Sequence, residues 1–446
     1  MPPHPYSHVR SGLAAGCVLI ALTVLAGCVR IASTTRVNVV GHPVVALDGV
    51  VGDGENDDTD GIQKALDSGA SIVYLPPPAR HYRISRALSI HSGQTLQMDA
   101  ATTIRLADGA NSHMIENADR RGGDKGISVI GGIWDGNNAG QTPHDFSPNV
   151  SFDHNRYIGV MLRFDNVQDL RLNGLTLKDP ESFAVQLANL DRFDVRDIVF
   201  DYNMLRPNMD GIHLNGNCRF GTITNLKGAT NDDMVALNAD DGGIAEMARG
   251  PIRDVRIDGL YAENGYTAVR LLSAGSPVSQ VHISNLFGTF RYNVLSFTHH
   301  NVHPGTPSRF DDIVIDNVFC SKPTEALANP LPSDDWGRTS SPLIWIASGV
   351  EVGSLTVRDL HRTERFDGAP DTIVVENDAA VEFLVVSDSS VHNQTTKPIA
   401  MLRNNGEITN LSMTKVRMSG RQGEPPDRVV DGGGVSAGKH LDCIYP

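Results

Sequence analysis

The sequence predicts an all-β fold: a single-stranded, right-handed parallel β-helix in which short strands stack coil upon coil. Six segments share one order of residues, namely apolar, polar, apolar, two polar or small, and apolar; they are residues 170–175, 193–198, 255–260, 281–286, 313–318 and 355–360. Their irregular spacing, 23 to 42 residues per coil, suits coils whose loops differ in length. Because no long stretch has the helical period, we expect roughly ten or more coils, each strand hydrogen-bonded to its equivalent one coil away.

Each coil also contains a second short strand, in which two apolar residues flank a third residue. The strands are residues 185–187, 212–214, 235–237, 269–271 and 295–297. Alternation of period two buries the flanking pair and exposes the middle residue. We therefore expect an outward ladder on one sheet made of Gln186, His213, Ala236, Arg270 and Ser296.

The segment of residues 49–66 contains several acids among small residues, a composition that could bind a metal ion. A capped helix explains these acids better. Asp58 or Thr59 can cap a short helix in which Ile62 and Leu66 belong to an apolar stripe. We expect this capping helix to close the N-terminal end of the solenoid, which can be one long domain because solenoids grow by adding coils.

The N-terminus is typical of an exported protein. Arg10 precedes an apolar stretch that is too short for a membrane span and that ends in Leu25-Ala26-Gly27-Cys28. This motif resembles a bacterial lipobox, which implies lipidation of Cys28; an ordinary signal peptide is the alternative. We expect a signal peptide over residues 1–27, a tether over 28–45 and the β-helix domain over 46–446, anchored at the cell envelope.

Charge and cysteine content limit the partners of the chain. The formal net charge of −14 becomes −15 without residues 1–27, a surface that disfavours nucleic acid and other polyanions. Cys218, Cys320 and Cys443 are far apart and lack metal-ligand spacing, so one disulfide and buried thiols both stay open. We expect a monomer without cofactor or metal.

Three aspartates form the candidate catalytic cluster. Asp210 follows Asn208-Met209, and Asp232 and Asp233 follow Asn231. Asp210 and Asp233 are 23 residues apart, one coil, so rungs about 4.8 Å apart bring the acids together beside the ladder. Glycoside cleavage needs one protonated and one ionised carboxyl group, and repulsion among clustered acids raises at least one pKa. The alternative is that these acids cap turns at the corners of the solenoid.

Two resemblances to known families support the fold and the site. Residues 49–66 followed by 72–76 resemble the opening of the pectin-lyase-like β-helix superfamily. Residues 131–137, then 208–211 and 232–233, are similar in order and spacing to glycoside hydrolase family 28, the polygalacturonases and related enzymes. The second resemblance implies hydrolysis of glycosidic bonds in a polysaccharide or oligosaccharide.

The family resemblance also implies roles for the three acids. Asp232 would be the general acid, Asp210 and Asp233 would activate water, and the reaction would invert the anomeric centre. Carboxyl groups only about 5 Å apart are instead typical of retaining enzymes, so both outcomes stay open.

The sequence departs from the family where the family has Gly-His-Gly and, further on, Arg-Ile-Lys. The corresponding strands here lie in residues 266–271 and 293–298, without that His or that Lys, and Arg270 stands one rung before the family's Arg. In polygalacturonases the Arg and Lys bind the uronate carboxylate. We therefore expect a neutral or differently decorated polysaccharide rather than polygalacturonate.

Several residues could contact this substrate, and we expect substrate-binding roles for Asn208, His213, Arg270, His299 and His300. Trp345 is either a stacking face for a sugar or an ordinary surface aromatic. The histidines do not complete a zinc ligand set. Two other classes stay open: a polysaccharide lyase, in which Arg270 is the clear cationic candidate, and a non-catalytic surface glycan binder.

Overall fold

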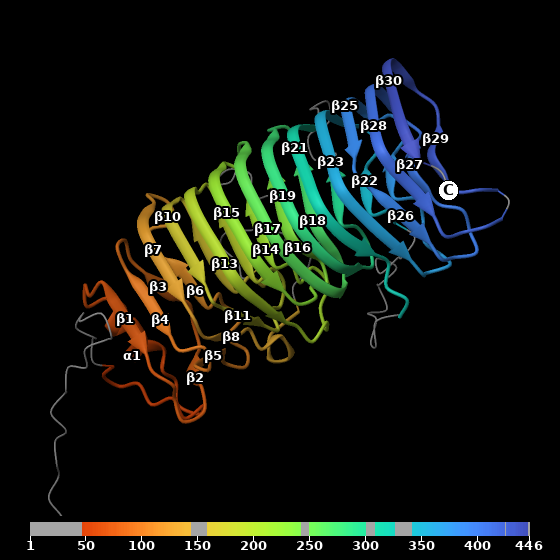
Figure 1. Ribbon diagram of the computed structural model, residues 1–446. Helices are drawn as coiled ribbons and strands as arrows, with labels where there is room; N and C mark the ends of the chain where they lie inside the picture. Colours follow the sequence, from red (N-terminus) through yellow and green to blue (C-terminus); the bar gives the residue numbers. More distant parts are fainter. Residues whose placement is uncertain are drawn as a thin grey trace, which may run out of the picture.

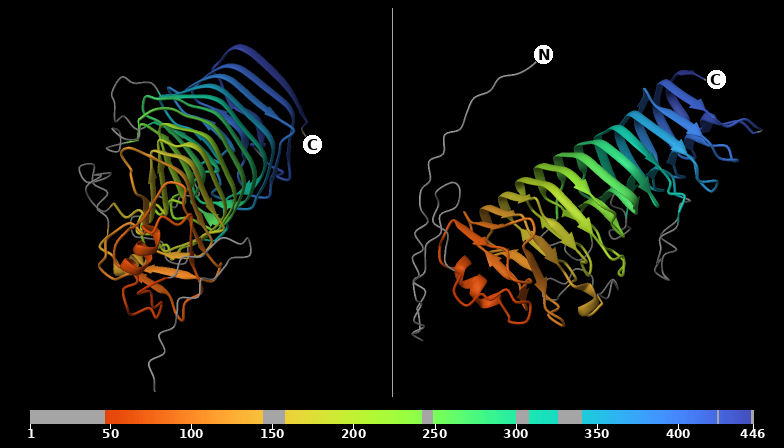
Figure 2. Two further views of the ribbon diagram at one scale, coloured as in Figure 1. Left: turned by 90° about the vertical axis from the view of Figure 1, so that its left-hand side faces the viewer. Right: turned by 60° about the horizontal axis from the view of Figure 1, so that its bottom comes forward.

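The computed structural model describes residues 47–143, 158–241, 249–299, 308–325, 341–423 and 425–444. In these ranges the chain is a solenoid of parallel strands that rises coil by coil from α1 to β30 (Figure 1). Two further views show the same elongated stack along and across its axis (Figure 2). The predicted all-β parallel β-helix is confirmed.

Two parallel sheets run along the solenoid. The twelve-stranded sheet, which we call the ladder sheet, contains β3 (Leu88–Ile90), β6 (Ile115–Asn117), β9 (Leu162–Asp165), β12 (Val185–Ala188), β14 (Ile212–Asn215), β16 (Asp233–Ala239), β18 (Thr267–Ser273), β20 (Leu295–Thr298), β22 (Ile344–Ile346), β24 (Ile373–Val375), β27 (Ala400–Asn404) and β29 (Arg428–Gly432). These strands follow one another in chain order, one per coil, which agrees with the predicted number of coils.

The eighteen-stranded sheet contains the longest strands of the described ranges, together with several short ones. They are β1 (Ile72–Leu75), β2 (Tyr82–Ile84), β4 (Thr95–Met98), β5 (Thr103–Leu106), β7 (Asp124–Ile130), β8 (Ile133–Asp135), β10 (Val167–Asn173), β11 (Thr176–Lys178), β13 (Asp191–Asp201), β15 (Cys218–Lys227), β17 (Ile252–Gly265), β19 (Val278–Phe290), β21 (Ser308–Ser321), β23 (Val350–Glu364), β25 (Ala380–Ser387), β26 (Ser390–Asn393), β28 (Glu407–Ser419) and β30 (Val435–Ile444). The six repeats read from the sequence fall on strands of this sheet, except that the last two residues of the repeat 170–175 follow β10. The apolar positions within the strands pair coil to coil.

The register of the ladder sheet agrees with the predicted ladder. Each of its five members is paired with the next, in the order Gln186, His213, Ala236, Arg270 and Ser296, and Trp345 follows Ser296. Their predicted exposure is wrong: Gln186, His213, Ala236 and Ser296 are buried, and Arg270 is half-buried. One physical reason is visible at His213, whose ring is covered by the ring of Phe183.

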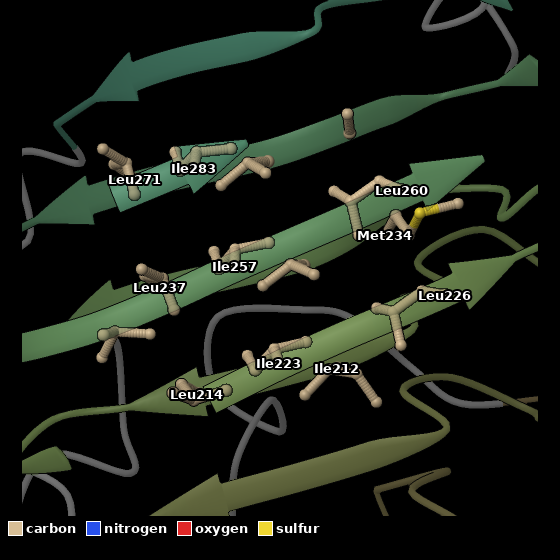
Figure 3. Packing of buried hydrophobic residues seen from close by; sticks show 14 of the residues in the cluster. Ile212, Leu214, Ile223, Leu226, Met234, Leu237, Ile257, Leu260, Leu271 and Ile283 are labelled. Atoms are coloured by element: carbon tan, nitrogen blue, oxygen red, sulfur yellow. The ribbon is translucent and has the colours of Figure 1, made fainter. Parts of the chain in front are cut away.

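Aliphatic side chains of both sheets fill the interior of the coils. Figure 3 shows those of β14, β16 and β18 packed in rows with those of β15, β17 and β19; the labelled residues are Ile212, Leu214, Ile223, Leu226, Met234, Leu237, Ile257, Leu260, Leu271 and Ile283. Close packing of branched side chains in equivalent positions leaves little freedom to the strands above them. The two rungs that carry the aspartates, those of β14 and β16, are therefore built on a rigid core.

One α-helix, α1 (Thr59–Leu66), is present in the described part of the chain and lies at the N-terminal end of the solenoid (Figure 1), with a single 3₁₀ turn, η1, at Asn138–Gly140. Ile62 and Leu66 are buried, as predicted. The Asp58 side chain does not cap α1; it accepts hydrogen bonds from the N–H groups of Val51, Gly52 and Arg83. None of the helices in the ranges described is long and apolar enough to span a membrane.

Candidate active site

The three aspartates lie on two adjacent rungs of the ladder sheet. Asp233 begins β16, Asp232 precedes it, and Asp210 stands two residues before β14. The Gly211 N–H donates a hydrogen bond of 2.9 Å to the carbonyl oxygen of Asp233, which joins the two rungs at the acids. The predicted proximity is confirmed. The three acids are buried: Asp210, Asp232 and Asp233 are only 1%, 5% and 2% exposed.

Glycine at position 211 is required by this close approach. A Cβ atom there would lie 2.4 Å from the carbonyl oxygen of Met234 and 2.5 Å from the ring of Phe200. Both contacts are far inside van der Waals distance, and one of them is to backbone. The Asp-Gly pair of the sequence motif therefore lets β14 lie against β16 with Asp210 beside the acids of the next rung.

Burial and mutual repulsion set the protonation of the cluster. Desolvation, and then the charge of Asp233, raise the pKa of both Asp210 and Asp232 well above the ordinary aspartate value. Burial also raises the pKa of Asp233, but there the charge of Arg270 opposes the rise. Asp232 is thus held protonated more readily than Asp233.

Arg270 reaches the cluster from the rung after β16. Its Nε atom lies 2.9 Å from Oδ2 of Asp233, an ion pair that is not aligned as a hydrogen bond. The negative charges of Asp233 and Asp232 oppose desolvation and raise the pKa of Arg270, so the guanidinium stays charged. A permanent cation beside one carboxylate of three favours ionisation of that carboxylate over the others.

His213 lies behind Asp210 rather than on an open face. Its Nδ1 atom is 2.7 Å from Oδ2 of Asp210, and its ring stacks on Phe183 with centroids 4.0 Å apart and planes at 13°. Burial lowers the pKa of His213 to about 4, so the imidazole is neutral at neutral pH. The side chain predicted to bind substrate therefore contacts a candidate catalytic acid.

Two further polar residues contact His213, and sequence reasoning missed both. The amide Nδ2 of Asn238 lies 3.2 Å from Nε2 of His213 and donates a 2.9 Å hydrogen bond to Oδ2 of Asp241. Asp241 Oδ2 itself is 3.8 Å from the imidazole Nε2. The sequence offered one signal for Asn238: it directly follows the apolar Leu237 of β16, and a polar side chain at such a position near the ladder needs a hydrogen-bond partner.

Aromatic residues stand next to the acids on the following rungs. Tyr266 stacks on Tyr292 with centroids 5.0 Å apart, and Tyr292 meets Trp345 edge to face at 6.2 Å. Tyr266 directly precedes Thr267, which pairs with Asp233, so it stands one rung after the acids. Burial, followed by the charges of Asp232 and Asp233, raises the pKa of Tyr266. Trp345 is half-buried, and its Nε1–H donates to Oε1 of Glu376.

The remaining predicted residues have varied positions. Asn208 is half-buried and left-handed, with φ of 54°, and His299 is half-buried just after β20. His300 and Cys28 lie outside the described residues. Where the structure describes the chain, no three His, Cys, Asp or Glu side chains are placed to hold a metal ion. Two cysteines, Cys218 and Cys320, are buried free thiols; nothing is described of the side chain of Cys443.

Comparison with known proteins finds the family expected from the motifs. Residues 79–250 match glycosyl hydrolases family 28. No curated protein matches the sequence. The matched region includes Asp210, Asp232 and Asp233, together with Asn238 and Asp241.

Solved structures share the fold at low identity. A Yersinia enterocolitica family 28 exopolygalacturonase is 16% identical with a TM-score of 0.59, over 88% of this chain and 77% of that one. The A-module of the Azotobacter vinelandii mannuronan C-5 epimerase AlgE6 is 12% identical with a TM-score of 0.59, over 89% and 97%. The pre-mature bacteriophage phi29 gene product 12 is 14% identical with a TM-score of 0.58, over 88% of this chain, which spans only 56% of the phage protein.

Likeness at these identities shows the fold alone, a right-handed β-helix, and the family match covers a stretch of the chain that contains the acids. The resemblance to glycoside hydrolase family 28 is therefore confirmed, through the family match over residues 79–250 and a β-helix shared with a family 28 exopolygalacturonase.

Proposed function

We propose that this protein hydrolyses glycosidic bonds of a polysaccharide, with Asp232 as general acid and with Asp210 and Asp233 activating water. The observation that carries the proposal is the burial of three carboxyl groups on two adjacent rungs beside one arginine. A buried acid with a raised pKa keeps its proton near neutral pH and can deliver it to a leaving oxygen. Asp233, next to Arg270, is the group best suited to stay ionised.

The reaction needs one water molecule. Asp232 transfers its proton to the glycosidic oxygen as the bond to the anomeric carbon breaks, and Asp210 or Asp233 takes a proton from the water that attacks this carbon. The family resemblance favours inversion. Proton NMR of the first product formed distinguishes the two anomers, and retention would contradict this part of the proposal.

The charge distribution around the acids supports a substrate that is neutral or differently decorated. Arg270 is paired with Asp233, and the Nε atom of Arg206 lies 2.8 Å from Oε2 of Glu181. A uronate carboxylate would have to compete with these buried partners for each guanidinium. Sugar rings without a carboxylate can instead pack on the aromatic group of Tyr266, Tyr292 and Trp345.

A polysaccharide lyase is the weaker alternative. A lyase must remove a proton beside a uronate carboxylate, and Arg270, the cationic candidate, has its pKa raised by Asp233 and Asp232. A guanidinium held charged in this way is a poor base. A non-catalytic glycan binder differs from both, because it would release no product.

Leaving-group dependence tests the role of Asp232. Asp232→Asn keeps size and removes the proton, so we expect about 10²- to 10⁴-fold slower hydrolysis of polysaccharide and a smaller loss on activated aryl glycosides. Asp210→Asn and Asp233→Asn should slow both substrates, and Asp311→Asn, on the exterior of β21, serves as the matched control. Near wild-type turnover by all three site variants would mean that the acids only cap turns.

A panel of neutral and acidic polysaccharides, assayed for new reducing ends, tests the substrate class. We expect turnover of a neutral or branched glycan in preference to polygalacturonate. Efficient turnover of polygalacturonate alone would refute the inference from the paired arginines. Unsaturated ends, detected by their ultraviolet absorbance, would indicate the lyase.

We further propose that the protein is exported and anchored at the cell envelope by lipid on Cys28, with residues 28–45 as a tether and 46–446 as the catalytic domain. The support is the lipobox-like motif of the sequence. Mass spectrometry of the mature N-terminus should find acylated Cys28 and no residues 1–27. An unmodified Cys28 would contradict the anchor and leave the catalytic proposal unaffected.

A further inference from the structure

We propose that Asn238 and Asp241 are positioning residues that fix the tautomer of His213, so that His213 donates a hydrogen bond from Nδ1 to Asp210. The contacts form a buried chain of side chains, from Asp241 through Asn238 and His213 to Asp210. The inference rests on the proposed function, in which Asp210 activates water. The tautomer itself can be observed without turnover.

The first step is the orientation of the Asn238 amide. Its Nδ2 atom lies 2.9 Å from Oδ2 of Asp241, and an ionised carboxylate only accepts hydrogen bonds, so the amide nitrogen must face Asp241. The same nitrogen carries a second hydrogen and lies 3.2 Å from Nε2 of His213. The direct distance from Nε2 to Asp241 is 3.8 Å, too long for a hydrogen bond. Nε2 therefore accepts from Asn238 and carries no proton.

The second step follows from the neutral imidazole. A neutral ring carries one N–H, and with Nε2 occupied as an acceptor this N–H is on Nδ1, 2.7 Å from Oδ2 of Asp210. Phe183 stacks on the ring and holds its plane. One carboxylate oxygen of Asp210 is thereby bound and the group is oriented.

The third step concerns the other oxygen of Asp210. Oδ1 is buried and has no hydrogen-bond partner among the residues of the described ranges. A buried carboxylate oxygen without a partner is costly unless water or a substrate hydroxyl meets it. The chain of contacts thus leaves Oδ1 as the one oxygen of Asp210 without a hydrogen bond in the described part of the chain.

The charged groups that face His213 are the acids Asp210, Asp233 and Asp241 and the cation Arg270. Burial, together with the charge of Arg270, outweighs the charges of Asp241 and Asp233 and lowers the pKa of His213 to about 4, so the ring is neutral above that pH. Burial raises the pKa of Asp210. A hydrogen bond donated from Nδ1 to Oδ2 favours the ionised form of a carboxyl group and so acts against this rise. Loss of this donor should make Asp210 harder to ionise.

An exchange of the two outer residues tests the proposal. The double variant Asn238→Asp with Asp241→Asn keeps composition and net charge but places an acceptor against Nε2. His213 should then carry its proton on Nε2 and lose the hydrogen bond donated to Asp210. Asn215→Asp is the matched control, because Asn215 occupies the equivalent position one rung earlier and accepts from Gln186.

The tautomer is read by nitrogen NMR of the full chain labelled with ¹⁵N-histidine, with the signals of His213 assigned by their loss in His213→Gln. We expect the Nδ1–H form in wild type and in Asn215→Asp, and the Nε2–H form in the exchange variant. An Nε2–H form in wild type overturns the proposal, and this spectrum decides the matter even when the exchange variant does not fold.

Kinetics provide the second readout. In the exchange variant kcat should fall by about 10²- to 10⁴-fold, the contribution of a general base, with KM little changed and the acidic limb of the pH profile moved upward. Wild-type kcat in the exchange variant, together with inactivity of Asp210→Asn, overturns the positioning role alone. Absence of hydrolysis by wild type would refute the proposed function, and the tautomer result would stand by itself.

Discussion

Replacing Arg270 by methionine removes the positive charge beside Asp233 while keeping a long, flexible side chain. Two opposite unit charges about 4 Å apart attract each other by about 4 kcal/mol at an effective dielectric constant of about 20. The observed contact of 2.9 Å between Nε and Oδ2 puts this pair in that range. Arginine neighbours lower carboxylate pKa values by about 1 to 3 units, so the pKa of Asp233 should rise by about this amount in Arg270→Met.

The assay is kcat/KM for reducing-end release as a function of pH. In the proposed mechanism Asp233 must be ionised to activate water, so the acidic limb should move up by about 1 to 3 pH units, and the rate below that limb should fall about tenfold for each unit. Arg270→Lys retains a charge and should move the limb less. Arg403→Met removes an arginine of the same sheet that pairs with Asp371 and Asp431, and serves as the control.

Stability gives an independent check on the same variant. Asp233 would be left buried without its cation, which costs about 3 to 5 kcal/mol when the carboxylate is ionised. The cost should disappear as the pH falls and Asp233 takes up a proton. An unchanged acidic limb in Arg270→Met, with normal folding, would refute the view that Arg270 controls the ionisation of Asp233.

Three further outcomes are expected. Asp232→Asn should raise the thermal midpoint of unfolding at pH 7, because burial raises the pKa of Asp232 in the folded protein above the ordinary 3.8 and ionisation of this group therefore opposes folding. Calorimetry should show no difference between the variant and wild type below about pH 4, and a lower midpoint of the variant at pH 7 would contradict the burial argument. In denaturant titration, Gly211→Ala should lower the free energy of unfolding by about 2 to 4 kcal/mol, because its Cβ would lie 2.4 Å from the Met234 carbonyl oxygen. The control Gly433→Ala should leave the free energy of unfolding unchanged, because the space around Gly433 is open. The Cys218 thiol, fully buried and with a pKa raised to about 12, should react with an alkylating reagent only after unfolding, and labelling of the native protein would show that this coil opens.

The fold could be predicted because a β-helix repeats its signal. Alternation of period two recurs in each coil, and equivalent apolar positions such as Val185, Ile212 and Val235 pair in the predicted register. The proximity of Asp210 to Asp233 followed from the same register. Sequence patterns of this kind describe the backbone and the strands that pair.

Burial of the ladder could not be predicted in this way. Alternation distinguishes the two faces of one strand, but it does not reveal which side chains from neighbouring turns cover the outer face, as Phe183 covers His213. The role of Asn238 depends on contacts with His213 and Asp241 that cross between a strand and the turn after it. Such contacts depend on side-chain conformation, which a pattern of apolar and polar residues does not determine.

The hydrogen bond from Gly211 N–H to the Asp233 carbonyl has a consequence for how the site can work. The backbone positions that carry Asp210 and Asp233 cannot approach or separate unless the ladder between β14 and β16 breaks, so only side-chain rotation changes the distance between their carboxyl groups. Under the proposed function, the protein therefore meets its substrate with a backbone geometry that is already set, and the sugar ring changes shape to reach the reactive arrangement. Selection for a new glycan can then act on single side chains along the ladder sheet, coil by coil, while the acids keep their places.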